Sequence, residues 1–251
     1  MKRFIQLFAA LVLLCSILSC QAYAQGESWY FKKKGNEPPT SGVSDDFLRQ
    51  TNSVWLDTAS NGDKVIYLTF DVGYINDNVI SVLDILKEEN VTAAFFVLGH
   101  PILKNTADIL RMKEDGHLVC SHTKGHGDIS EMTDAELESE LTTLEKIYEE
   151  KTGYTLDKYF RPPEGKYSKR ALLTVKQLGY RTVFWSYAYA DWDEKTEHNE
   201  AKILKKLTDN AHPGEILLLH PTSTINAKVL RPFIHAMKEK GYRFSSLDKI
   251  L

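Results

Sequence analysis

The sequence predicts an α/β domain in which parallel strands curl into a barrel. Seven short apolar segments alternate with helical patterns along residues 61–251, which is typical of parallel strands joined by right-handed crossovers. Several strands are apolar without interruption, as expected for a sheet covered on both faces. Reactive side chains follow five strands, and the carboxyl ends of parallel strands meet at one face of a barrel. An open doubly wound sheet is the alternative architecture.

β-Branched and aromatic runs that stop at turn or reactive residues identify the strands. The first run starts at Val65 and stops at Asp71, just before Gly73. A later one, Tyr159-Phe160-Arg161, is stopped by two prolines. The predicted strands cover, in chain order, 65–71, 92–97, 117–120, 159–161, 180–185, 215–220 and 243–245.

Apolar periodicity and capping residues identify the helices. The segment 133–152 opens with Thr133-Asp134-Ala135-Glu136, a capping box, and Ser168 is a predicted N-cap. Glycines close four of the helices: Gly116, Gly153, Gly179 and Gly241. The predicted helices cover 78–89, about 106–115, 133–152, 168–179, 200–207 and 227–240.

The N-terminus has the features of a signal peptide. Two basic residues precede an apolar run over 4–18, and Ala22-Tyr23-Ala24 supplies small residues for cleavage. We therefore expect a signal peptide at 1–24 and export across the cytoplasmic membrane. Lipoprotein processing at Cys20 is the less favoured alternative.

Composition limits the class of protein and the partners to expect. The 251-residue chain is 43% hydrophobic and 26% charged, which is typical of a globular protein, and its formal net charge of −3 gives no reason to expect a nucleic-acid partner. After signal cleavage only Cys120 remains, so an intrachain disulfide is excluded, and we interpret this cysteine as a buried hydrophobe.

Residues 25–60 form a polar, irregular N-terminal extension in which Trp29-Tyr30-Phe31 is expected to pack on the main domain, 61–251.

Five strand ends carry side chains with chemical potential: Asp71; His122 with His126; Arg161; Asp191 with Trp192; and His220. The two imidazoles can reach one divalent ion if their loop curls at Gly125, and two surface histidines are the alternative. Arg161 is a natural ion-pair partner for Asp71 and would hold its pKa low.

The remaining strand ends suggest oxyanion, sugar and proton-donor roles. Pro162 and Pro163 lack N–H groups, so the amide of Glu164 is the first that could bind an oxyanion. Trp192 and the aromatic residues before Asp191 suit one wall of a sugar-binding groove, with loop packing as the alternative. A histidine that ends a strand of leucines, His220, is a candidate general acid, and a core histidine is the alternative.

Five segments together resemble the motifs of the polysaccharide deacetylases, the NodB-homology domain of carbohydrate esterase family four. They are Thr69-Phe70-Asp71-Val72-Gly73-Tyr74, His122-Thr123-Lys124-Gly125-His126, Arg161-Pro162-Pro163, Asp191-Trp192 and Leu217-Leu218-Leu219-His220. The resemblance spans about 61–251 and implies a distorted (β/α)7 barrel-like single catalytic domain. It also implies an amide hydrolase that removes N-acetyl groups from a carbohydrate.

The resemblance implies a role for each motif residue. Asp71 is then the general base and His220 the general acid, while Arg161 tunes Asp71 and Asp191 tunes His220. His122 and His126 are the metal ligands. The oxyanion and substrate contacts fall to Pro163, Glu164, Tyr74, Trp192 and Leu218.

Val72 departs from the family pattern. Most members have a second Asp there, which completes an Asp-His-His metal site, whereas the lactam-type subgroup usually has Asn. Valine cannot bind a metal, so we expect a weak site for a divalent ion, with zinc the expected metal.

Within the family the chain most resembles the delta-lactam-biosynthetic de-N-acetylases of spore formers. Matching segments include Trp29-Tyr30-Phe31, Phe184-Trp185-Ser186 and His212-Pro213-Gly214. The resemblance implies that the substrate is peptide-free N-acetylmuramic acid in peptidoglycan glycan strands, and that the product leads to muramic-δ-lactam in spore cortex. It also implies functional dependence on an N-acetylmuramoyl-L-alanine amidase, and we expect a monomer. The alternatives are deacetylation of N-acetylglucosamine in peptidoglycan or of chitin-like oligomers, and a catalytically silent glycan-binding protein.

Overall fold

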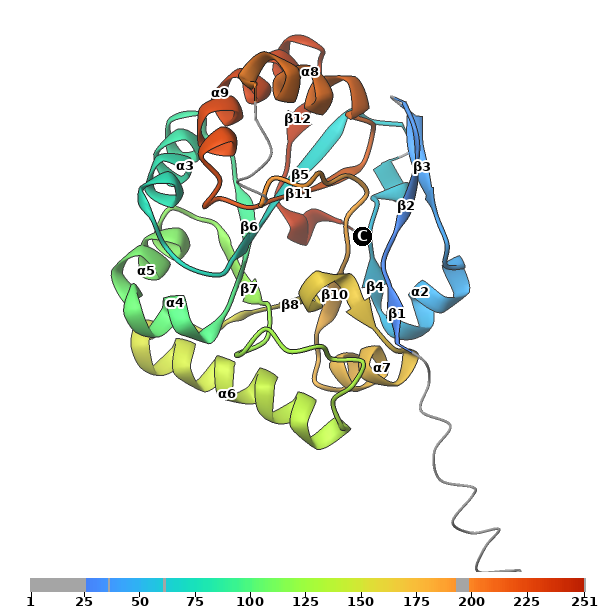
Figure 1. Cartoon of the computed structure of the whole chain (residues 1–251), viewed down its shortest axis with the longest axis vertical. Helices are drawn as coiled ribbons and strands as arrows, with labels where there is room; N and C mark the ends of the chain where they lie inside the picture. Colours follow the sequence, from blue (N-terminus) through green and yellow to red (C-terminus); the bar gives the residue numbers. More distant parts are fainter. Residues whose placement is uncertain (1–25, 36, 61, 193–198, 251) are drawn as a thin grey trace, which may run out of the picture.

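A curled parallel sheet surrounded by helices forms the centre of the molecule. The structure, a computed structural model, describes residues 26–35, 37–60, 62–192 and 199–250. Figure 1 shows the helices in an outer ring around the strands. The sheet strands are β4 (Ser53–Val54), β5 (Val65–Val72), β6 (Ala93–Val97), β7 (Leu118–Ser121), β8 (Asp157–Phe160), β10 (Arg181–Val183), β11 (Glu215–Leu219) and β12 (Arg243–Phe244). The helices of the ring are α3 (Asp77–Glu88), α4 (Gly99–Lys104), α5 (Thr106–Glu114), α6 (Asp134–Thr152), α7 (Lys169–Gln177), α8 (Glu200–Asn210) and α9 (Thr224–Glu239).

The strands follow the order β11-β5-β6-β7-β8-β10-β4, all paired in parallel, and β12 pairs with the start of β5. After β10, Tyr187 forms an isolated parallel bridge with Leu217 of β11, and Leu56 after β4 bridges Glu215 in the antiparallel sense. These two bridges join the ends of the strand order. The predicted barrel-like α/β fold is confirmed.

Side-chain alternation along β5 separates an outer core from a barrel interior. Ile66, Leu68, Phe70 and Val72 belong to the core that contains the apolar faces of α3 and α9. The alternate residues point inward: Val65 and Tyr67 pack in the barrel interior with Phe96 and Cys120, and Thr69 and Asp71 continue on this side toward the carboxyl end. The inward face of β5 is therefore apolar where the strand begins and polar where it ends.

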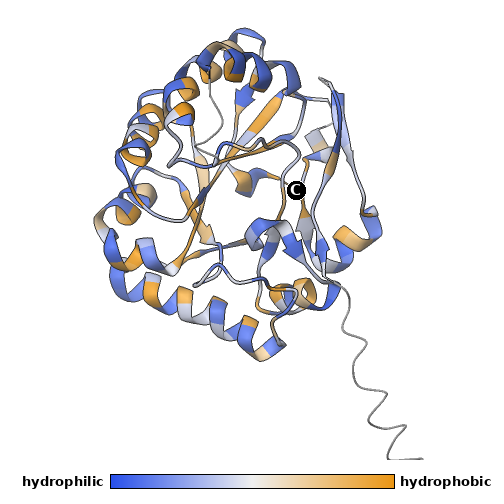
Figure 2. Ribbon diagram, viewed as in Figure 1, coloured by the Kyte–Doolittle hydropathy of each residue, from blue (hydrophilic) through white to orange (hydrophobic). Residues whose placement is uncertain are grey.

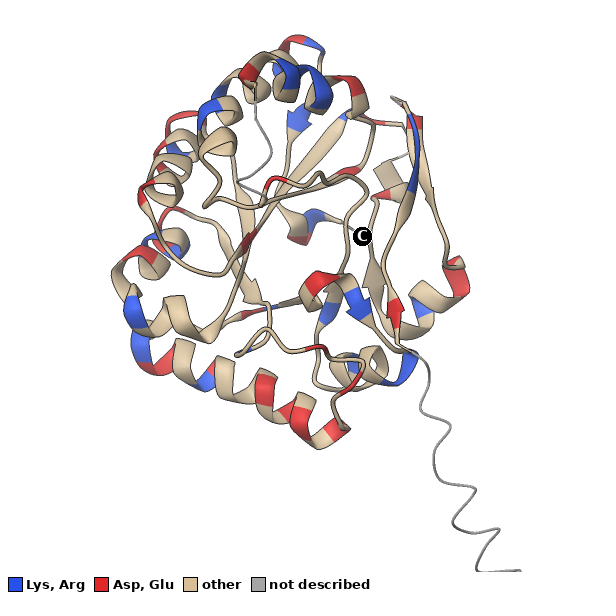
Figure 3. Cartoon of the chain, in the orientation of Figure 1, with Lys and Arg blue, Asp and Glu red and all other residues tan. Residues whose placement is uncertain are grey.

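The helices place their polar faces on the outside. Figure 2 shows hydrophilic and hydrophobic residues alternating along them, and in Figure 3 the charged residues gather on the outer helices while the central strands are mostly uncharged. The predicted capping box of α6 is present, since Glu136 N donates to the Thr133 side chain and Thr133 N donates to Glu136. Ser168 caps α7 through the amide of Ala171. None of the helices in the described ranges is long and apolar enough to cross a membrane.

The segment before β5 is more ordered than the sequence predicted. It contains β1 (Glu27–Ser28), β2 (Phe31–Lys34), β3 (Glu37–Ser41) and α2 (Asp45–Thr51) ahead of β4. The prediction of an irregular extension was wrong, because β4 pairs with β10 as an edge strand of the main sheet. Trp29 does pack on the main domain, stacked on Phe184 with ring centroids 4.3 Å apart, whereas Tyr30 is 55% exposed. The predicted signal peptide, 1–24, lies outside the described residues, and the domain boundary at residue 61 stays a prediction.

Gly214 holds the two ends of the strand order together. Its N–H donates to Val65 O, and its carbonyl accepts from Asp57 N at 2.9 Å. Its φ is +75°, and a Cβ there would lie 2.3 Å from the backbone oxygen of Asp57. This approach is possible only without a side chain.

We predict that Gly214→Ala destabilises the protein more than Gly153→Ala does. Both glycines have nearly the same φ, +75° and +76°, but a Cβ on Gly153 meets nothing within 4 Å. Both variants should lose about 1 kcal/mol to the left-handed backbone, and Gly214→Ala should lose roughly 1–3 kcal/mol more to overpacking. Urea unfolding of the two variants measures the difference, and equal losses would contradict the steric argument.

Candidate active site

A cavity of about 680 Å³ opens at the carboxyl ends of the strands. Its lining combines titratable groups with an aromatic and apolar wall. It consists of Asp71, His122, His126, Glu164, Trp185, Ala188, Tyr189, Trp192, Leu218 and His220. The predicted convergence of strand ends at one face is therefore present in the structure.

Asp71, the last inward residue of β5, is anchored by Arg161, which follows β8. Arg161 Nη1 donates to Asp71 Oδ1 at 2.8 Å, and Arg161 Nη2 donates to Thr69 Oγ1 at 2.9 Å. Its Nε donates to Val183 O at 3.0 Å, and the guanidinium lies 4.2 Å from the ring centroid of Phe96. Arg161 is fully buried, so these partners take the place of its water shell.

The pKa of Asp71 is lowered although the carboxylate is buried. Burial alone would raise this pKa, but the charges of Arg161, His122 and His220, with the Arg161 hydrogen bond, outweigh it. The carboxylate is therefore ionised at neutral pH. One oxygen binds Arg161, while Oδ2 lies 3.7 Å from His122 Nε2 on the cavity side. This arrangement suits a base that takes a proton from water.

The loop after β7 brings two imidazoles to the cavity. The rings of His122 and His126 meet edge to face with centroids 5.0 Å apart. His122 Nδ1 lies 2.9 Å from the carbonyl of Arg161, an acceptor, so Nδ1 carries the proton and Nε2 keeps its lone pair. Burial, the largest cause, lowers the pKa of His122 to about 4, so the ring is neutral at pH 7.

The same loop has a strained backbone. Thr123 and His126 adopt φ values of +67° and +61°, which non-glycine residues seldom do. Thr123 Oγ1 accepts from His126 N at 2.8 Å, and Glu140 of α6 accepts from Gly125 N at 2.7 Å. These bonds hold the curled loop that places both rings at one cavity.

His220, just after β11, is paired with the buried Asp191. Its Nδ1 donates to Asp191 Oδ1 and its backbone N–H to Asp191 Oδ2, both at 2.7 Å. Burial alone would lower the pKa of His220, but the hydrogen bond and charge of Asp191, helped by Asp71, outweigh it and raise the pKa. His220 thus keeps a proton to higher pH than an ordinary histidine, and its Nε2 is the ring nitrogen not bonded to Asp191. A proton donor needs these properties.

The remaining predicted contact residues are placed unequally. Glu164 lines the cavity in the turn η2 (Pro163–Gly165), where its φ is +55°. Leu218 and Trp192 also line it, and Trp192 is 67% exposed. Among the described residues, Tyr74 and Pro163 do not line it: Pro163 is buried, and Tyr74 is 48% exposed.

The donors at the cavity fit a divalent ion only in part. His122 and His126 offer two imidazole nitrogens, but position 72, where the family pattern has a third ligand, holds a valine, which has no donor atom and is fully buried in the outer core. The described part of the chain contains no group of three His, Cys, Asp or Glu side chains arranged to hold a metal. Two protein ligands leave the other coordination positions to water or substrate.

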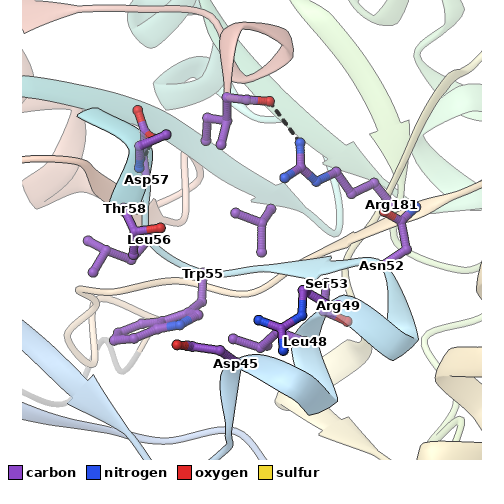
Figure 4. A pocket seen from close by; sticks show the side chains of 13 residues that line it. Asp45, Leu48, Arg49, Asn52, Ser53, Trp55, Leu56, Asp57, Thr58 and Arg181 are labelled. Carbon is purple, nitrogen blue, oxygen red and sulfur yellow. Dashed lines mark hydrogen bonds between the residues drawn. The ribbon is translucent and has the colours of Figure 1, made fainter. Parts of the chain in front are cut away.

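A second cavity, of about 470 Å³, lies beside β4 and the start of β10 (Figure 4). Trp55, Leu48 and the side chains of Arg49 and Arg181 surround it, and Arg181 donates to Ile250 O at 2.8 Å. No predicted site residue lines it.

Sequence reasoning missed two polar residues behind the cavity. Thr69 binds Arg161 and donates to Leu217 O at 2.7 Å, but a threonine within a strand looks structural in a sequence. Asn226 was left outside the predicted helix 227–240, whereas α9 begins at Thr224 and buries this asparagine beside Asp191. A polar residue on the apolar face of a helix was the available signal.

Comparisons with known proteins agree with this geometry. Residues 58–183 match the polysaccharide deacetylase family. The chain is 36% identical over 226 residues to the peptidoglycan-N-acetylmuramic acid deacetylase PdaA of Bacillus subtilis, covering 89% of this chain and 85% of that protein. It is 31% identical to the peptidoglycan-N-acetylglucosamine deacetylase PgdA of Listeria monocytogenes, covering 75% of this chain and 39% of that protein.

Solved structures of family 4 carbohydrate esterases are also similar to this chain. The structure of Bacillus subtilis PdaA, a family 4 carbohydrate esterase, superposes with a TM-score of 0.85 at 35% identity, covering 90% of this chain and 97% of that one. A family 4 carbohydrate esterase from Bacillus anthracis superposes with a TM-score of 0.74 at 36% identity, covering 90% of this chain and 96% of that one. With the family match across half of the sequence, these likenesses show that the chain belongs to the polysaccharide deacetylases, the carbohydrate deacetylases of esterase family 4.

Proposed function

We propose that this enzyme removes the N-acetyl group from N-acetylmuramic acid residues of peptidoglycan whose peptide has already been cleaved off. The observation that carries the proposal is the placement of the Asp71 carboxylate and the His220 imidazole at one cavity, each fixed by its own buried partner. The glycan assignment is supported by the likeness across most of the chain to a relative named for N-acetylmuramic acid deacetylation. The freed amine would then close on the lactyl carboxyl group to give muramic-δ-lactam.

The residues can divide the hydrolysis of an amide between them. Asp71 takes a proton from a water molecule, which attacks the acetyl carbonyl carbon. The amide N–H of Glu164 stabilises the negative oxygen that forms. His220 gives its proton to the departing nitrogen, the C–N bond breaks, and acetate and the free amine leave. Trp192 and Leu218 offer an apolar wall for the sugar and the acetyl methyl group.

A divalent ion held by His122 and His126 would polarise the acetyl carbonyl group and lower the pKa of a bound water. We propose zinc as this ion.

We also propose that the enzyme acts outside the cytoplasmic membrane. Residues 1–24 would direct export, and the enzyme would act as a monomer on glycan strands in the wall or spore cortex. An N-acetylmuramoyl-L-alanine amidase must act first, because the lactyl carboxyl group is free only after the peptide is removed.

We expect the purified enzyme to release acetate from muramic acid in amidase-treated peptidoglycan. Mass spectrometry of the digested glycan should show loss of one acetyl group per modified muramic acid. Asp71→Asn should lower the rate by at least about a hundredfold, because the general base is lost. Asp84→Asn, at an exposed ion pair with Arg111, is the matched control and should act like wild type.

The alternatives give different products in this assay. Acetyl loss from glucosamine alone, or from chitin-like oligomers, would replace the proposed substrate. No acetyl loss from any glycan, with or without added metal, would indicate a silent glycan-binding protein.

We predict weak zinc binding and activity that depends on added divalent ion. Calorimetric titration should give a low affinity, because two imidazoles are the only clear protein ligands among the described residues. His126→Ala should abolish this binding, while His235→Ala, at an exposed histidine on α9, should leave it unchanged. Full activity after exhaustive chelation would contradict the prediction.

We predict that Asp191→Asn narrows the pH range of activity from the alkaline side. In the wild type the raised pKa of His220 keeps it protonated as the pH rises, and Asp191 is the main cause of that increase. Without this charge the pKa of His220 falls, so the alkaline limb of kcat against pH should move to lower pH. Asp209→Asn, at a surface pair with Lys205, is the control. An unmoved alkaline limb in Asp191→Asn would show that His220 is not the acid.

A further inference from the structure

Asn226, in the first turn of α9, is a buried polar residue behind the cavity. Only 1% of its surface is exposed. Its Nδ2 donates to Asp191 Oδ2 and, at 2.9 Å, to the backbone carbonyl of His220. The amide thus touches both members of the Asp191–His220 pair, although it does not line the cavity.

Tyr189 fixes which way this amide faces. The Tyr189 hydroxyl donates to Asn226 Oδ1, so the carbonyl side of the amide faces Tyr189 and both Nδ2 hydrogens remain for Asp191 and His220. Tyr189 is itself 9% exposed and lines the cavity. A continuous chain of hydrogen bonds therefore runs from Tyr189 through Asn226 and Asp191 to His220.

The carboxylate of Asp191 needs this third donor for a fixed orientation. Among the described residues its other two partners are the Nδ1 and the backbone N–H of His220, and both move with that residue. Asn226 ties the carboxylate to a helix packed in the outer core, where Val229 and Leu230 of α9 are buried. Such outer partners commonly set the geometry of a functional histidine.

We propose that Asn226, with its amide oriented by Tyr189, is a positioning residue that holds the Asp191 carboxylate against His220 and keeps His220 Nε2 directed at the scissile amide nitrogen. The proposal rests on the proposed function, in which His220 protonates the leaving amine. It adds a residue outside the five sequence motifs to the apparatus of proton donation.

In the described part of the chain, the charged groups that act on His220 come from three places. They are Asp191 after β10, Asp71 at the end of β5 and Arg161 after β8. None of them is altered by substitution at Asn226 or Tyr189. A change in the titration of His220 in such variants would therefore report a change in the placement of Asp191.

The test compares Asn226→Leu and Tyr189→Phe with wild type. We expect kcat to fall roughly tenfold or more in Asn226→Leu with KM little changed, since the cavity lining is intact. We also expect the pKa of His220, followed by NMR of labelled histidines, to fall because the carboxylate is no longer held against the ring. Tyr189→Phe keeps the aromatic ring of residue 189 but leaves the Asn226 amide free to turn. It should therefore lower kcat and the pKa of His220 as well, but by less than Asn226→Leu.

Val229→Ala separates positioning from stability. It removes buried side-chain volume from the same helix without touching Asp191, so it should lower the melting temperature and leave kcat and the His220 titration as in wild type. An unchanged or higher pKa of His220 in folded Asn226→Leu would overturn the proposal. If Asn226→Leu does not fold, an unchanged kcat and an unchanged pKa of His220 in Tyr189→Phe would overturn it. The NMR titration needs no substrate, so a wild-type protein that deacetylates nothing would refute the proposed function and still leave the positioning role tested.

Discussion

The ion pair between Arg161 and Asp71 is the constraint on which the rest of the site depends. A fully buried guanidinium is tolerated only if each of its N–H groups has a partner. The partners of Arg161 lie on β5, on β10 and at Phe184, the residue after β10. Its own carbonyl accepts from His122. One side chain and its backbone thus connect Asp71, the loop of His122 and strand β10. These contacts are possible only because the sheet curls until the strand ends meet.

Burial alone would favour the neutral forms of Asp71 and His220, and neighbouring charges reverse this for each of them. Burial raises the pKa of a carboxyl group and lowers that of an imidazole. At Asp71 the nearby cations outweigh burial, and at His220 the carboxylates do. His122 lacks a sufficient counter-charge, and its pKa falls to about 4. Neighbouring charges therefore separate the three groups: they favour the ionised form of Asp71 and the protonated form of His220, while His122 stays neutral at pH 7.

The sequence predicted the long elements and most of the cavity, because these depend on local signals. Apolar runs and capping residues identify β5, α6 and α7 without knowledge of their neighbours. The short strand β4 carries no such signal, since its two residues become a strand only by pairing with β10. Asn226 was missed for a related reason: a polar residue on an apolar helix face can be noticed in the sequence, but its partner Asp191 lies 35 positions earlier in the chain, and no local pattern identifies that contact.

Val72 packs in the outer core and supplies no metal ligand. Side chains alternate along β5, and Asp71 faces the cavity while Val72 packs on the helix side in the outer core. The valine stabilises the contact between sheet and helices, and in this conformation its position contributes nothing to the cavity. Under the proposed function, hydrolysis would then depend more heavily on Asp71, His220 and the residues that orient them. The dense hydrogen bonding around Arg161 and Asp191 fits such a dependence, because it fixes Asp71 and His220 from behind the cavity.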